Sequence, residues 1–343
     1  MLTYKEITSQ PEAMELLFGF LQLERKEIES FFKEAHSNLI FIGSGSSYLI
    51  AKSVADMYTV LSGNPAYAFT AGEILLRPVR AKKLFQNSIA ITFSRSGQTS
   101  ELIKAVEILK EAHNAKIFSF ICSDGSKLSE LSDCCFEMSY AFDESVCQTR
   151  SVTCMYLAAQ MIFTSIINKN NIKSDLESAA MGLSKFIKQN EPELKSIGES
   201  DFSSAVVLAD GEISGICEEG ALAFKEISQI PSNRYSVLDV RHGPIVLIGE
   251  GTLVLVCGGE LRNLELNLIK DLVKKNARVV VYSDLPIKIE GVYANINFGK
   301  NLDYVAKVIP FIVMCQLIAY YKAIKTGVNP DQPTGLDAWI SLK

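Results

Sequence analysis

The chain has 343 residues, 48% of them hydrophobic and 21% charged, and its formal net charge is −5. This length suits two domains of about 150 residues, each able to bury its own core. The composition is that of an ordinary globular protein, and its mildly acidic balance gives no support for a nucleic-acid partner, because such binding requires a basic face.

Cysteine use and the apolar segments predict a protein of the reducing cytoplasm. None of the eight cysteines forms a CxxC pair, and the adjacent Cys134 and Cys135 are expected to be packed thiols rather than a bridge. The N-terminal MLTYKEITSQP lacks a basic stretch followed by an apolar one, so we expect no secretory signal. The longest apolar run, 309–321, contains Pro310 and Gln316 and is too short to span a bilayer, so no membrane partner is expected.

Strands and helices alternate in the first half of the chain. Helical periodicity covers 10–34, and a short apolar strand at 38–42 leads through a glycine–serine turn into a second helix. Further apolar strands are expected at 89–93, 116–122 and 135–139, with helices between them and a helix carrying Met155 and Met161 after them. This alternation predicts an α/β fold with a doubly wound parallel sheet.

The turn after the strand at 89–93 reads Ser94-Arg95-Ser96-Gly97-Gln98-Thr99 and precedes an amphipathic helix. A helix N-terminus offers unpaired backbone N–H groups and partial positive charge, so this turn could hold a phosphate. The alternative is a capped turn that holds nothing, since the lysine of a P-loop is missing. The earlier turn, 43–47, has Tyr48 where a dinucleotide fingerprint has its third glycine, and we reject an NAD site.

The second half repeats the first. A polar segment at 190–201 is the expected linker, and strands at 205–208, 252–256 and 279–282 correspond to those at 38–42, 89–93 and 117–121. This pattern predicts a domain duplication rather than a solenoid, with domains at 1–190 and 191–343. In the second copy, the segment from Gly258 to Asn263 replaces the hydroxyl-rich turn and brings a carboxylate, so a phosphate is expected in the first copy only.

Two side chains of the second half suit proton transfer. Glu226 lies on a helix and His242 in a turn fixed by Gly243-Pro244, while His36 and His113 are expected to be exposed. Taken singly, a histidine is more often structural and a helix glutamate more often solvated. Beside a phosphate cradle, however, the pair suits ring opening and a proton shift next to a carbonyl.

Five segments, in this order, resemble the sugar isomerase (SIS) family: FIGSGSSY, ITFSRSGQTSE, ESVCQTRSVT, EEGALAFKEIS and RHGPI. The similarity extends over about residues 35–343, as two SIS domains. The family members that the chain resembles are the isomerase half of glucosamine-6-phosphate synthase and the stand-alone ketose/aldose isomerases and deaminases. The resemblance implies that Glu226 moves the C1/C2 proton and that His242, lent by the neighbouring subunit of a homodimer, opens the sugar ring. It implies phosphate contacts from Ser94, Arg95, Ser96, Gly97, Gln98 and Thr99, and sugar contacts from Ser46, Ser47, Val146, Cys147, Gln148 and Arg150.

The departures from the synthase pattern are also informative. The synthase lysine three residues before its catalytic glutamate is Ala223 here, and Ala338 stands where the synthase has a Schiff-base lysine. An enediol or enediolamine route through Glu226 needs neither lysine, and no metal or redox cofactor is expected. Arg150 replaces a further synthase lysine and could hold an anionic group, or it could pair with Asp143 or Glu144.

The resulting expectation is an isomerase or deaminase acting on a hexose 6-phosphate or amino-hexose 6-phosphate. The chain begins directly with the isomerase part, so glutamine is not expected to serve it as ammonia donor. One alternative is a deglycase that splits fructosamine 6-phosphates. Another is a non-catalytic phosphosugar-binding regulator, which Glu226 and His242 disfavour.

Overall fold

The structure is a computed structural model that describes residues 1–34, 36–79, 81–258, 260–340 and 342. The chain forms two compact units. The first, called here the N-terminal unit, comprises Ser9–Ser174 and Asp337–Lys343, and the second, the C-terminal unit, comprises Met1–Thr8 and Asp175–Leu336.

The N-terminal unit contains a parallel sheet in the order β2-β1-β3-β4-β5. Its strands are β1 (Leu39–Gly43), β2 (Ala66–Thr70), β3 (Ile89–Ser94), β4 (Lys116–Ile121) and β5 (Cys134–Glu137). Its helices are α2 (Gln10–Phe32), α3 (Ser46–Ser62), α4 (Ala71–Leu76), α5 (Lys82–Phe85), α6 (Ser100–His113), α7 (Lys127–Leu131) and α8 (Arg150–Ile166), with a short 3₁₀ segment η1 (Ser139–Ala141) before α8. The predicted doubly wound parallel sheet is confirmed.

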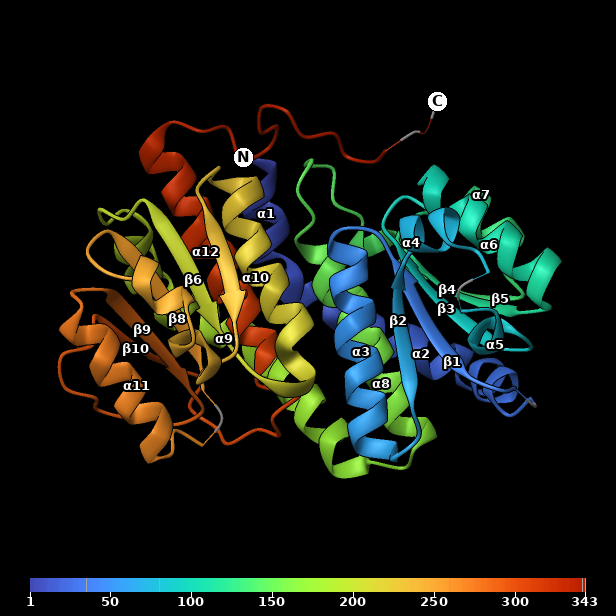
Figure 1. Cartoon of the computed structure of the whole chain (residues 1–343), viewed down its shortest axis with the longest axis horizontal. Helices are drawn as coiled ribbons and strands as arrows, with labels where there is room; N and C mark the ends of the chain where they lie inside the picture. The colour runs from blue at the N-terminus through green and yellow to red at the C-terminus, as the bar shows by residue number, and fades with distance from the viewer. Residues whose placement is uncertain (35, 80, 259, 341, 343) are drawn as a thin grey trace. The chain divides into compact units, whose positions relative to one another are not determined.

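Both faces of this sheet are buried, which explains why its strands are unbroken apolar runs rather than alternating ones. Ile40, Ile117 and Ile121 belong to a core shared with α6, whereas Phe41 and Phe118 meet aromatic side chains of α8 and α2 on the opposite face. Figure 1 shows α3 and α8 on one side of the sheet and α6 and α7 on the other.

The C-terminal unit contains a second parallel sheet, in the order β10-β9-β8-β6-β7. Its strands are β6 (Ser204–Leu208), β7 (Ser232–Tyr235), β8 (Thr252–Cys257), β9 (Arg278–Ser283) and β10 (Ala294–Asn297). Its helices are α1 (Leu2–Thr8), α10 (Ser214–Ile227), α11 (Asn263–Lys274) and α12 (Val308–Thr326), with 3₁₀ segments η2 (Gly211–Ile213), η3 (Asp239–Arg241) and η4 (Pro244–Leu247). Strand for strand, the order matches the first sheet, as the sequence repeat predicts.

The segment expected to be a linker is largely helical. Helix α9 runs from Asn170 to Gly198 with Pro192 inside it, and the two compact units divide near its start, at 174/175. The polar residues of this long helix led to the prediction of a linker. The division into domains at 190/191 stays a prediction.

Helix α12 has the length and composition of a membrane span, but 78% of its most apolar window is buried inside the protein. Helices α10 and α12 contact each other, and Phe311 of α12 packs on Tyr282 of β9. A helix in a protein core is hydrophobic on all its faces, as a membrane-spanning helix is. The burial of α12 therefore explains its hydrophobic composition.

Three strands and one histidine differ from the sequence expectations. Strands β2, β7 and β10 are sheet-edge strands of four or five residues, too short for their periodicity to be recognised, and β7 and β10 are also rich in polar residues. His113, expected to be exposed, is only 3% exposed and packs against the ring of Phe85. The prediction was wrong because this last residue of α6 faces the core side of its helix.

Candidate functional site

In the N-terminal unit, the direction in which strands are added to the sheet reverses at β1, although all the strands stay parallel. From β1 the chain crosses to β2 on one side, and then returns to β3 on the other side of β1. Ligands of doubly wound sheets bind outside the carboxyl ends of the strands at such a switch point. The Gly43–Ser47 turn and the Ser94–Thr99 turn follow these two neighbouring strands, so the fold brings the two hydroxyl-rich turns to one place.

Hydroxyl groups shape the turn between β3 and α6. Ser94 Oγ accepts a hydrogen bond from the Gly97 N–H at 2.9 Å, and Ser96 Oγ accepts one from the Gln98 N–H at 3.1 Å. Thr99 is the N-cap residue of α6, but its side chain makes no capping hydrogen bond. By contrast, Thr70 and Ser126 cap α4 and α7 through their hydroxyls. The turn therefore keeps its shape while the N-terminus of α6 is not capped by its own side chain.

Gly97 is required by both conformation and space. Its φ angle is +61°, and a Cβ there would lie 2.1 Å from Ser126 Oγ and 2.4 Å from Ser126 Cβ. The Gly97 carbonyl also accepts a hydrogen bond from the Leu128 N–H at 3.1 Å. The phosphate-type turn is thereby locked to the neighbouring turn after β4, which sequence reasoning did not connect with it.

The turn after β1 also requires glycine and carries buried hydroxyls. A Cβ at Gly43 would meet the Ser47 backbone at 2.3 Å, and Gly45 has a φ of +57°. Ser46 and Ser47 lie buried in the first turn of α3. Ser44 Oγ is buried with no hydrogen-bond partner among the described residues. Sequence reasoning missed Ser44, although its position between two glycines at a strand end is a usable signal.

Arg95 was expected to contact a phosphate, but its guanidinium contacts three backbone carbonyls. Nη1 donates to the carbonyl oxygens of Ser145 (2.8 Å) and Val146 (3.1 Å), and Nη2 donates to that of Ala338 (2.6 Å). The side chain is 3% exposed and lies 5.9 Å from the ring centroid of Phe142. Arg95 therefore joins the turn to the loop at 143–149 and to the C-terminal segment.

The loop at 143–149 is held by Asp143. Its carboxylate accepts hydrogen bonds from the backbone N–H groups of Thr149, Arg150 and Ser151 at the start of α8. A carboxylate at this position satisfies unpaired amides and the helix dipole together. The same loop presents Val146 and Gln148, both partly exposed, whereas the side chain of Cys147 is buried.

None of the described ion pairs joins the Arg150 guanidinium to Asp143 or Glu144. Its Nη2 donates to the Phe142 carbonyl, and its Nη1 donates to Ser9 Oγ at 3.1 Å. The Arg150 guanidinium thus holds Phe142, the residue before the loop at 143–149, whereas Arg95 holds carbonyls within the loop. The neighbouring Cys122 thiol is fully buried, and burial raises its pKa well above the usual value, so it is not a nucleophile at this turn.

The corresponding turn of the C-terminal unit is filled. Leu261 has a positive φ of 48°, as Gly97 does, but the Leu261 side chain lies over Gly258, where a Cβ would meet Leu261 Cδ2 at 2.5 Å. Arg262 and Glu265 form a capping box on α11, and Arg262 pairs with Glu260. Gly259, part of the predicted equivalence, lies outside the described residues. In the second copy, Leu261 fills the turn and side chains cap the helix that follows it, whereas the equivalent helix of the first copy has no side-chain cap.

Glu226 and His242 belong to the C-terminal unit. Glu226 lies in the last turn of α10 and is partly exposed. His242 is exposed between η3 and η4, and its backbone N–H donates to the Asp239 carbonyl at 2.8 Å. The catalytic roles of both residues stay predictions.

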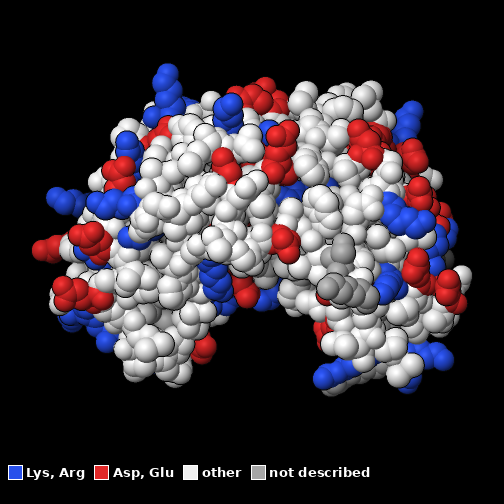
Figure 2. All heavy atoms as spheres, turned by 90° about the horizontal axis from the view of Figure 1, so that it is seen from above, with Lys and Arg blue, Asp and Glu red and all other residues white. Residues whose placement is uncertain are grey.

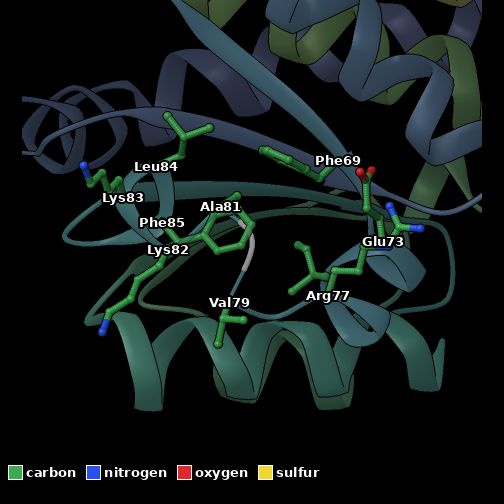
Figure 3. A pocket seen from close by; sticks show the side chains of 10 residues that line it. Phe69, Glu73, Arg77, Val79, Ala81, Lys82, Lys83, Leu84 and Phe85 are labelled. Atoms are coloured by element: carbon green, nitrogen blue, oxygen red, sulfur yellow. The ribbon is translucent and has the colours of Figure 1, made fainter.

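A separate hollow of about 560 Å³ lies in the N-terminal unit between β2, α4 and α5. Figure 3 shows Phe69, Phe85 and Val79 around its floor, with Lys82 and Lys83 at one end and Glu73 and Arg77 at the other. Its floor is apolar and it lacks the hydroxyl-rich turn, so it does not suit a small hydrophilic sugar.

Charge and thiols agree with the composition. On the face shown in Figure 2, acidic and basic side chains are interspersed and no broad basic field is visible. All eight cysteines are free, as expected for packed thiols. Within the described part of the chain, no group of three or more histidine, cysteine or acidic side chains has the geometry of a metal site.

Comparison with known proteins matches part of the chain to a family model. Residues 31–165, which carry both hydroxyl-rich turns, match the SIS domain. The matched residues all belong to the N-terminal unit.

Several of the relatives and structural neighbours carry the names of phosphosugar enzymes. The chain is 28% identical to the glutamine–fructose-6-phosphate aminotransferase (isomerizing) of Chlamydia muridarum over 99% of its own length, but spans only 58% of that relative. It is 27% identical to the D-galactosamine-6-phosphate deaminase AgaS of Shewanella sp. (strain ANA-3), over 86% of the chain and 77% of the relative. The crystal structure of glucosamine-6-phosphate deaminase from Thermotoga maritima superimposes with a TM-score of 0.84 at 26% identity, covering 100% of both chains.

Proposed function

We propose that the chain is an enzyme that isomerises or deaminates a hexose 6-phosphate or amino-hexose 6-phosphate. The observation that carries this proposal is the pair of hydroxyl-rich turns at the β1/β3 switch point, one of them ending at the α6 N-terminus without a side-chain cap. Such a terminus stabilises an anion through its N–H groups and dipole. The deaminases among its relatives support the choice of substrate class.

The proposed reaction proceeds through an open-chain sugar. His242 transfers the proton that opens the ring, and the Glu226 carboxylate removes the proton from C2 of the aldose, giving an enediol or enolamine. Return of that proton to C1 gives the ketose or, for an amino sugar, a ketimine that water hydrolyses to ketose and ammonia. The loop at 143–149 would hold the sugar chain while its phosphate rests on Ser94, Ser96 and Thr99.

A homodimer in which His242 serves the site of the neighbouring subunit forms part of the proposal, as does a cytoplasmic location. The exposed position of His242 and of Val246 and Leu247, which follow it directly, supports a surface that another chain covers.

The test is a substrate panel combined with one substitution. Purified protein is incubated with galactosamine 6-phosphate, tagatose 6-phosphate and fructoselysine 6-phosphate, and ammonia, isomer and free lysine are measured. Release of lysine would favour the deglycase, and tight binding without turnover of any sugar phosphate would favour a regulator.

Glu226→Gln tests the proton carrier in the same assay. It should lower kcat by about 10²–10⁴-fold while sugar phosphate still binds, because the amide cannot carry the proton. Glu218→Gln, on the same helix α10, is the matched control and should retain turnover. Full activity of Glu226→Gln would exclude the assignment.

A further inference from the structure

The C-terminal segment lies against the N-terminus of α6. The Ile340 carbonyl oxygen is within hydrogen-bond distance of the Ser100 N–H (3.4 Å) and the Ser100 hydroxyl (3.3 Å), and the Leu342 N–H donates to the Ser100 hydroxyl at 2.7 Å. The helix end proposed to hold a phosphate is therefore flanked by the last described residues of the chain.

Arg95 holds this segment from the other side. The hydrogen bond of 2.6 Å from its Nη2 to the Ala338 carbonyl spans 243 positions of sequence, while its Nη1 holds the carbonyls of Ser145 and Val146. One planar guanidinium thus joins two segments, which lie far apart in the sequence, to the turn that carries it.

The arrangement is costly for folding alone. None of the described ion pairs involves Arg95, and its Nε is buried with no partner among the described residues. A buried charge satisfied only by carbonyls, with one unpaired donor, destabilises a fold relative to an apolar side chain. Retention of such a group beside a candidate site points to a role in that site.

We propose that Arg95 is a positioning residue: it clamps the C-terminal segment around Ala338 to the loop at 143–149 and so shapes the sugar end of the site, without contacting the phosphate itself. The proposal rests on the proposed function for its substrate, but the clamp itself is independent of that function. The role of Arg95 depends on the planar set of N–H donors of its guanidinium, which reaches both segments at once, and not on its positive charge.

Arg95→Lys and Arg95→Gln test the clamp by hydrogen–deuterium exchange of the whole protein without ligand. Lysine keeps the charge but not the fork, so both variants should speed exchange about tenfold or more in the peptides that contain Ser145–Val146 and Ala338–Ile340. Arg150→Gln is the matched control: its guanidinium contacts the same loop region but not the C-terminal segment, so the Ala338 peptide should remain protected. Unchanged protection of that peptide in both Arg95 variants would overturn the proposal.

Binding and kinetics separate positioning from contact. For Arg95→Lys, the affinity for inorganic phosphate should stay within about twofold to threefold of the parent, while the KM for the sugar phosphate rises about tenfold and kcat changes less. A rescue of KM by lysine, or a parallel loss of inorganic phosphate affinity, would make Arg95 a charge or contact residue and overturn the proposal. If the parent turned over no sugar phosphate, the proposed function would fail, whereas the exchange experiment would still decide the clamp.

Discussion

Gly97 and Ser126 approach each other so closely that a Cβ on Gly97 would lie 2.1 Å from the Ser126 hydroxyl oxygen. This close packing leaves no room for a side chain at Gly97 and joins the turn after β3 to the turn after β4. The two turns therefore hold their shape together, and a change at one is transmitted to the other.

Gly97→Ala should accordingly disrupt the candidate site and destabilise the N-terminal unit. The positive φ alone costs about 1 kcal/mol, and the collision with Ser126 adds to it, for a total of about 2–4 kcal/mol. Gly125→Ala is the matched control, because Gly125 has a similar φ of +60° and open space around its Cβ position. Urea denaturation measures both variants, and equal losses would show that the contact with Ser126 is unimportant.

His242→Asn should abolish turnover of cyclic sugar phosphates. Asparagine keeps a polar group of similar size but cannot exchange a proton near neutral pH. A 5-deoxy ketohexose 6-phosphate lacks the C5 hydroxyl and carries its phosphate on O6, so it can close neither a furanose nor a pyranose ring. The variant should therefore turn it over at a rate close to that of the parent. Initial rates on both substrates check this, and an equal loss on the open-chain analogue would assign His242 a role after ring opening.

The buried ion pair of Lys307 and Asp284 should show a strong asymmetry between single and double variants. Its atoms lie 2.8 Å apart, and the side chains are 7% and 15% exposed. Lys307→Met leaves a carboxylate buried without its partner and should cost about 3–5 kcal/mol, whereas adding Asp284→Leu should recover part of the loss. Lys195→Met, which removes an exposed pair with Glu199, should cost at most about 1 kcal/mol in the same urea titrations.

Acid should loosen the N-terminal helix α1. Burial acts to raise the pKa of Asp331, but hydrogen bonds from the Thr3 backbone and hydroxyl and from the Leu2 backbone outweigh it and hold that pKa below its usual value. A depressed carboxyl pKa stabilises the folded state above the unfolded-state value of about 3.9, and this stabilisation disappears as pH falls through the folded-state pKa.

Asp331→Asn tests this linkage. The difference in melting temperature between the parent and the variant should be constant near neutral pH and shrink below about pH 4. A difference that persisted at pH 2 would indicate that the side chain stabilises α1 by packing rather than by charge.

The sequence predicted most of the scaffold, because buried parallel strands such as β3 and β8 are apolar runs that end in turn residues. Strands at the sheet edges, such as β7 and β10, escaped recognition, since only part of each is buried and their composition is mixed. The hydroxyl-rich turns were located from sequence, and so was their failure to recur in the second copy.

What the sequence did not reveal are the contacts between distant segments. The residue type of Arg95, next to Ser94 and Ser96, suggested a phosphate ligand, because nothing local shows that its guanidinium reaches Ala338. Ser126 and Asp143 likewise act through backbone groups far from any motif. Such contacts follow from how the turns approach one another, which periodicity does not encode.

Leu261 has a broader consequence. Two identical copies of one domain would have two equivalent binding turns, and such a chain would bind two ligands. In the second copy, the Leu261 side chain stands where the first copy has Gly97. It fills that turn without altering the order of the strands. On the proposed function, each chain is therefore expected to bind one anion rather than two, while the second sheet keeps the strand order of the first.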